Sequence, residues 1–68
     1  MQIDLVSENM TISAELKSLV CYDMPELYVL KFTVMDQDGV EIYVEGTARN
    51  AYIFNNKLYL EEFRRTNI

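Results

Sequence analysis

The chain has 68 residues, of which 11 are Asp or Glu, 6 are Lys or Arg and none is His, so its formal charge is −5. This length allows one small globular domain, residues 1–68. The lack of histidine excludes Ser-His-Asp and Cys-His nucleophiles, imidazole metal ligands and imidazole proton shuttles, and the single cysteine excludes an intrachain disulfide.

The first third of the chain alternates apolar and polar residues. Ile3 and Leu5 alternate with Gln2 and Asp4, and the alternation resumes from residue 10 to residue 17. A period of two residues is typical of strands, so we expect an N-terminal hairpin. The alternative is an α+β fold with one helix around residues 11–22, because four apolar residues there also follow helical spacing: Ile12, Leu16, Leu19 and Val20.

The clearest element is a hairpin between residues 27 and 45. Two runs rich in Val, Phe, Tyr and Thr flank the turn Asp36-Gln37-Asp38-Gly39. A type I turn with Gly39 in the left-handed conformation would set Asp36 beside Val40. Counting outward then pairs Met35 with Glu41 and Lys31 with Glu45. It also gathers the apolar residues on one face: Leu30, Phe32, Val34, Ile42 and Val44.

A second hairpin is expected between residues 51 and 60, with its turn at Asn55-Asn56. We favour a three-residue loop, which pairs Phe54 with Leu58 and Tyr52 with Leu60. A two-residue loop would instead pair Phe54 with Lys57 and Tyr52 with Tyr59. The other alternative is a helix beginning at Asn56, with Tyr59 and Phe63 on one face.

Together these elements predict a mainly β domain, a five-stranded antiparallel sheet or barrel. The strand pattern over residues 10–47 is similar to the middle of an OB-like or SH3-like barrel, without any family-specific motif. Asp4 lies where a secretory signal would be basic, and no uncharged run approaches the roughly 18 residues of a membrane span. We therefore expect a cytoplasmic protein that does not enter membranes, with Cys21 as a small buried side chain.

No cofactor or metal site is expected. Asp36, Asp38, Gly39 and Glu45 match positions three, five, six and twelve of an EF-hand loop, but Val34 occupies the first ligand position and strand-forming residues flank the loop. Solvated carboxylates such as Glu61 and Glu62 do not suffice for acid-base catalysis. The sequence therefore indicates a protein that acts by binding.

The N-terminal and C-terminal parts of the chain have net charges of opposite sign. Residues 1–48 contain nine acidic and two basic residues, a net charge of −7, whereas residues 49–68 contain four basic and two acidic residues, a net charge of +2. The acidic part predicts a non-enzymatic protein-binding module, an inhibitor or assembly factor that binds a basic surface and at the extreme imitates a nucleic acid. The expected contact residues are Asp36, Asp38, Glu41, Tyr43 and Glu45.

The basic C-terminal part supports an alternative, a nucleic-acid-binding β domain, because basic and aromatic side chains together hold single strands. The residues concerned are Arg49, Tyr52, Lys57, Tyr59, Arg64 and Arg65. A homodimer is also expected, because the outward face of the hairpin between residues 27 and 45 is unusually apolar and open sheets must protect their edges. That face contains Val29, Thr33, Met35 and Tyr43.

Overall fold

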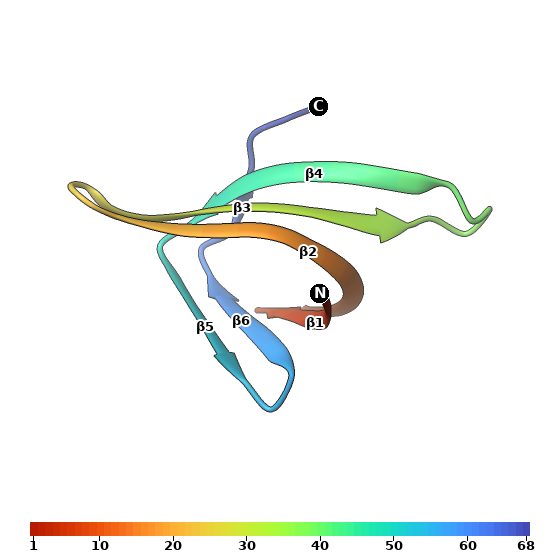
Figure 1. Cartoon of the computed structure of the whole chain (residues 1–68), viewed down its shortest axis with the longest axis horizontal. Helices are drawn as coiled ribbons and strands as arrows, with labels where there is room; N and C mark the ends of the chain where they lie inside the picture. Colours follow the sequence, from red (N-terminus) through yellow and green to blue (C-terminus); the bar gives the residue numbers. More distant parts are fainter.

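The computed structural model describes all 68 residues and contains seven strands and no helix (Figure 1). The strands are β1 (Gln2–Ser7), β2 (Met10–Asp23), β3 (Glu26–Met35), β4 (Glu41–Ala48), β5 (Asn50–Phe54), β6 (Lys57–Glu61) and β7 (Arg64–Arg65). They form one sheet in the order β5-β6-β1-β2-β3-β4-β7. All neighbours are antiparallel except β1 and β6, which are parallel. Membrane-spanning helices are thus absent from the structure.

The mainly β prediction is confirmed, but the predicted five strands and the closed barrel are wrong. The sheet has seven strands and stays open, because β5 and β7 end the strand order and do not pair with each other. The alternative helix around residues 11–22 is also wrong. This segment belongs to β2, which is paired with β1 on one side and with β3 on the other.

Two predicted hairpins have the expected strands. β1 and β2 form the N-terminal hairpin, closed by the pair Ser7 and Met10. In the β3–β4 hairpin both predicted pairs are confirmed, Met35 with Glu41 and Lys31 with Glu45. The register matters because a slip of one residue would turn the apolar side chains of one of the two strands toward solvent.

The third hairpin, β5–β6, differs from the favoured prediction. The loop has two residues, so Phe54 pairs with Lys57 and Tyr52 with Tyr59, and the three-residue loop is wrong. Asn55 and Asn56 have φ angles of 50° and 60°, as the two central residues of a type I′ turn require. The alternative helix from Asn56 is wrong too, because β6 is a strand paired with both β5 and β1.

A bulge in β2 bends the sheet around its core. Leu16 pairs with Phe32 and Ser18 with Lys31, which leaves Lys17 as the extra residue. Such bulges bend a strand and increase its twist. Figure 1 shows the result: β2 curves, and β5, β6 and β1 lie beneath the layer formed by β3 and β4. The ten buried hydrophobic residues lie between these layers: Ile3, Leu5, Ala14, Leu30, Phe32, Val44, Ala48, Ala51, Leu58 and Leu60.

Candidate functional site

The turn of the β3–β4 hairpin is held by the Asp36 carboxylate. Its Oδ1 accepts hydrogen bonds from the backbone N–H groups of Asp38, at 2.8 Å, and Val40, at 2.9 Å. The Asp36 N–H also donates to the Val40 carbonyl at 2.9 Å, and Gly39 has a φ of 77°. The predicted turn is therefore confirmed. Asp36 stabilises the turn and is less available to a partner than its neighbours.

The five predicted protein-binding residues, Asp36 included, lie on or beside one surface. We use the name acidic surface for Asp36, Asp38, Glu41, Tyr43 and Glu45. Along β4, Glu41, Tyr43 and Glu45 alternate with residues that face the core, so they share the outward side of the sheet. Asp38 follows in the turn. Neither the Asp38 nor the Glu41 carboxylate lies within 4.0 Å of a basic nitrogen.

Glu45 and Tyr43 contact each other on this surface. The Tyr43 hydroxyl donates to Glu45 Oε1 at 2.8 Å. This hydrogen bond to a carboxylate, together with partial desolvation, raises the pKa of the Tyr43 hydroxyl above its ordinary value. Lys31 is opposite Glu45 in the register, as predicted, but the two do not form an ion pair.

The C-terminal tail runs along the outer edge of β4. Asn67 Oδ1 accepts from the Glu45 N–H at 2.7 Å and from Arg65 Nε at 3.0 Å, and Asn67 Nδ2 donates to the Tyr43 carbonyl at 3.0 Å. Arg65 Nη2 also donates to the Tyr43 carbonyl, at 3.3 Å. Arg65, assigned from the sequence to the nucleic-acid alternative, thus lies beside the acidic surface. Nothing in the local sequence indicated the role of Asn67.

The residues of the nucleic-acid alternative are only partly brought together. The Tyr52 and Tyr59 rings stack with their centroids 5.0 Å apart, and Lys57 lies on the same side of β6 as Tyr59. Arg64 lies on β7, at the other end of the strand order. Arg49 forms an ion pair with Glu62 at 3.5 Å.

Arg49 and Arg64 do share a shallow depression, but Glu26 and Glu62 line it as well. The depression therefore has mixed charge. Among the basic and aromatic residues proposed from the sequence, Tyr52, Lys57 and Tyr59 lie together on the β5–β6 hairpin. Lys57 forms no ion pair, and its neighbour on β1 is Asp4.

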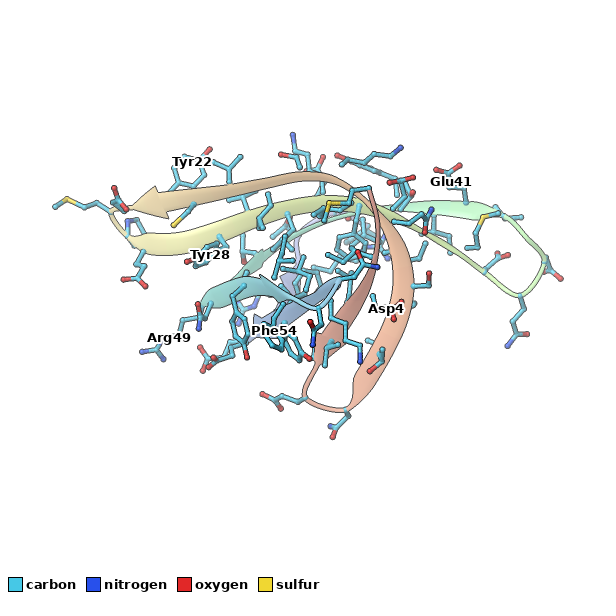
Figure 2. The ribbon with its side chains drawn as sticks, turned by 60° about the horizontal axis from the view of Figure 1, so that its bottom comes forward. Asp4, Tyr22, Tyr28, Glu41, Arg49 and Phe54 are labelled. Carbon is cyan, nitrogen blue, oxygen red and sulfur yellow. The ribbon has the colours of Figure 1, made fainter.

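Cys21 is exposed, which contradicts the predicted buried side chain. The reason is that Cys21 lies beyond the pairing of β2 with β1, which ends at Glu15, and opposite Tyr28, where the pairing of β3 with β4 also ends. Figure 2 shows the labelled Tyr22 and Tyr28 at that end of the sheet. The neighbouring Cys21 thiol raises the pKa of the Tyr28 hydroxyl.

The molecule has four open depressions of about 500–590 Å³, lined mostly by polar residues, and one smaller hollow lined mostly by apolar residues. The most apolar one has a volume of about 180 Å³ and lies among Leu5, Ile12, Phe32 and Phe63, below the roughly 300 Å³ of the smallest typical ligand pockets. No three side chains of the types His, Cys, Asp and Glu converge as metal ligands. No protein-family model matches the chain, and neither a curated protein nor a solved structure is significantly similar to it.

Proposed function

We propose that this protein is a non-enzymatic binding module whose acidic surface contacts a basic surface of another protein. The observation that supports this most directly is that the Asp38 and Glu41 carboxylates project from a well-paired hairpin and are not neutralised by any cation of the chain. A carboxylate without an intramolecular partner can pair with a cation of a binding partner without first breaking a contact. The hairpin itself is held by eight strand pairs and by the Asp36 hydrogen bonds.

Exposed apolar side chains flank these carboxylates. Met35 is 66% exposed, Val40 56% and Tyr43 44%. Met and Tyr are enriched at protein interfaces, where desolvated aromatic residues often contribute most of the binding energy. Charge complementarity chiefly accelerates association and selects the partner. The combination suits a protein interface better than a purely solubilising acidic face.

The mode of action follows from this binding. A chain without a catalytic group acts by covering the partner's surface, as an inhibitor, or by joining the partner to another component, as an assembly factor. Where the covered surface is a nucleic-acid groove, Asp38, Glu41 and Glu45 would take the places of phosphates.

The second candidate function is single-strand binding by the β5–β6 hairpin. The exposed Tyr52, Phe54 and Lys57 favour it, because aromatic and basic side chains are the usual contacts of unpaired bases and phosphates. However, Tyr52 and Tyr59 stack on each other, and the net charge of −5 repels phosphate. We therefore rank this function second.

The test uses charge reversal on matched variants. Asp38→Lys with Glu41→Lys alters the acidic surface, and Glu8→Lys with Asp23→Lys makes the same change in net charge elsewhere. The partner is first isolated by capture of the tagged chain from its own cell lysate, with and without nuclease, and identified by mass spectrometry.

The proposal predicts a nuclease-insensitive partner of fixed stoichiometry that the first double variant binds at least about tenfold more weakly, while the control double variant binds normally. Equal binding by all three proteins would contradict it. The alternative is tested with a single-stranded oligonucleotide of 12 nucleotides in fluorescence anisotropy. Binding that is lost with Lys57→Glu, together with partners lost after nuclease, would replace the proposal with the second function.

A further inference from the structure

The two ends of the sheet differ in whether another segment covers the edge strand. The β4 edge is paired with β7 and is then covered by Thr66 and Asn67, which hydrogen-bond to Glu45. The β5 edge faces no strand at all. Natural sheets usually protect such an edge with charge, proline or a covering segment. Residues 50–56 contain no charged residue and no proline.

The bare edge is also apolar. Tyr52 is 50% exposed, Ile53 49% and Phe54 60%. Figure 1 shows the β5–β6 hairpin projecting from the body in a different direction from the β3–β4 turn. An exposed, apolar edge strand is a template for pairing with another chain.

The hairpin geometry identifies which backbone groups are free. In a two-residue hairpin the residues that flank the turn, here Phe54 and Lys57, form a hydrogen-bonded pair, and the pairs alternate from there. Tyr52 therefore directs its N–H and C=O toward β6. Ala51 and Ile53 direct theirs outward, toward the open edge.

We propose that β5 pairs with β5 of a second copy of this chain, antiparallel and with the two Tyr52 residues directly opposite each other. In this register Ala51 of one copy and Ile53 of the other exchange the hydrogen bonds that are free in the monomer. Tyr52 is the middle residue of Asn50–Phe54, so every residue of the strand gains a partner. The proposal does not depend on the proposed function.

The stacked tyrosines favour a second copy over an unrelated strand. Tyr52 and Tyr59 already stack at 5.0 Å with their rings 14° apart, which is close to the spacing of neighbouring strands. A symmetric pair extends this stack to four rings, Tyr59 and Tyr52 of one copy followed by Tyr52 and Tyr59 of the other. Aromatic cross-strand pairs are among the most stabilising in antiparallel sheets.

The charges permit the same arrangement. Two copies with a charge of −5 each repel one another at most surfaces. Residues 49–62 are neutral as a group, with Arg49 and Lys57 against Glu61 and Glu62. Pairing through β5 therefore keeps the strongly acidic N-terminal 48 residues away from the interface, and it leaves the acidic surface of each copy free.

The interface is small. An aromatic side chain buries roughly 200 Å² when fully covered, so the half-exposed Tyr52, Phe54 and their strand offer a contact well below the roughly 800 Å² per partner of a standard interface. We therefore expect a reversible dimer. Sedimentation velocity should show the dimer fraction rising over a range of about 5–500 μM protein.

The register is tested by cross-linking in a Cys21→Ser background. Opposite residues in a non-hydrogen-bonded antiparallel pair have Cα atoms about 4.5 Å apart, within the range of a disulfide. Tyr52→Cys should therefore form a covalent dimer on mild oxidation. Ile53→Cys should not, because the two copies of residue 53 would be diagonal neighbours about 7–8 Å apart. Met35→Cys, exposed on another strand, serves as the control.

The edge itself is tested with Ile53→Pro and Ile53→Lys. The Ile53 N–H points outward, so proline removes no hydrogen bond within the chain but blocks the partner strand. Both variants should remain monomeric up to about 500 μM, while Met35→Lys should dimerise like the wild type. Circular dichroism checks that each variant folds.

Three results would overturn the proposal. The first is a wild-type chain that stays monomeric throughout this range. The second is dimerisation that survives Ile53→Lys in a folded protein. The third is cross-linking of Tyr52→Cys no faster than that of Met35→Cys, or slower than that of Ile53→Cys.

Discussion

The ring of Phe63 lies against the backbone of Gly46. A β-carbon at Gly46 would come within 2.5 Å of Phe63 Cζ and 2.7 Å of the Arg64 carbonyl oxygen. The same ring packs against Phe32, with their centroids 5.9 Å apart. Because Gly46 has no side chain, the Phe63 ring can lie against it and cover the core. β7, which follows Phe63 in the chain, can then pair with the edge of β4.

Replacing this glycine should destabilise the fold. The Gly46→Ala methyl group would displace both the Phe63 ring and the β7 backbone, and overpacking of this kind typically costs about 1–3 kcal/mol. Urea denaturation measures the change in the free energy of unfolding. The control is Thr47→Ala, at the neighbouring residue on the other side of the strand. A Gly46→Ala protein as stable as the control would show that Phe63 does not pack here as described.

The Asp36 carboxylate should contribute to stability through the turn. Asp36→Ala removes the acceptor of two backbone N–H groups, and we expect the free energy of unfolding to fall by about 1 kcal/mol. Asp36→Asn keeps an oxygen at this position and should restore much of the loss. Asp38→Ala, whose side chain has no hydrogen-bond partner, should be close to neutral. Equal effects of Asp36→Ala and Asp38→Ala in urea denaturation would contradict this role.

The stability should depend on pH through Glu15. The Met1 amine forms an ion pair and hydrogen bond with Glu15, which lowers the pKa of the carboxyl below its ordinary value of about 4.5. A carboxyl whose pKa is lower in the folded state stabilises the fold above its unfolded pKa. That contribution is lost as the pH falls below about 4.5 and through the lowered folded pKa.

Thermal unfolding between pH 7 and pH 3 tests this dependence. Glu15→Gln should lower the melting temperature at pH 7, and its difference from the wild type should disappear at the acidic end. Glu8→Gln, in the exposed turn between β1 and β2, should run parallel to the wild type. A Glu15→Gln difference that is constant across the range would exclude the ionic contribution.

The Asn67 side chain should protect the edge of β4. Asn67→Ala removes its hydrogen bonds to the Glu45 N–H and the Tyr43 carbonyl. We expect faster hydrogen exchange at the Glu45 amide, measured by NMR, and a loss of about 0.5–1.5 kcal/mol in stability. Ile68→Ala is the control, because Ile68 is fully exposed. Unchanged exchange at Glu45 would show that the tail does not cover this edge.

The sequence predicted the register of a hairpin correctly where the residues of that hairpin determine it, and wrongly where contacts with other strands determine it. In β3–β4 the turn residues and the alternation of apolar side chains indicate the same register, and the structure has it. In β5–β6 the favoured register was wrong because it paired apolar residues within the hairpin. The burial of Leu58 and Leu60 comes instead from the core beneath β6 and from its pairing with β1. Phe54 can therefore lie opposite the polar Lys57.

In the candidate site too, the sequence predicted the residues that local patterns place and missed those that distant contacts place. The sequence placed Glu41, Tyr43 and Glu45 on one outward face, since strand period and turn chemistry are local properties. It did not place Arg65 and Asn67 beside that face, because their positions depend on β7 reaching an edge strand about 20 residues away in the chain.

The sequence by itself determined the strands of the three hairpins and the turn from Asp36 to Gly39, because alternation and the preference of Asp, Asn and Gly for turn conformations act within a few residues. Only the tertiary structure decided the parallel pairing of β1 with β6, the bulge at Lys17 and the exposure of Cys21. These features arise from contacts between distant segments, which satisfy backbone groups and bury apolar surface together. No short stretch of sequence specifies them alone.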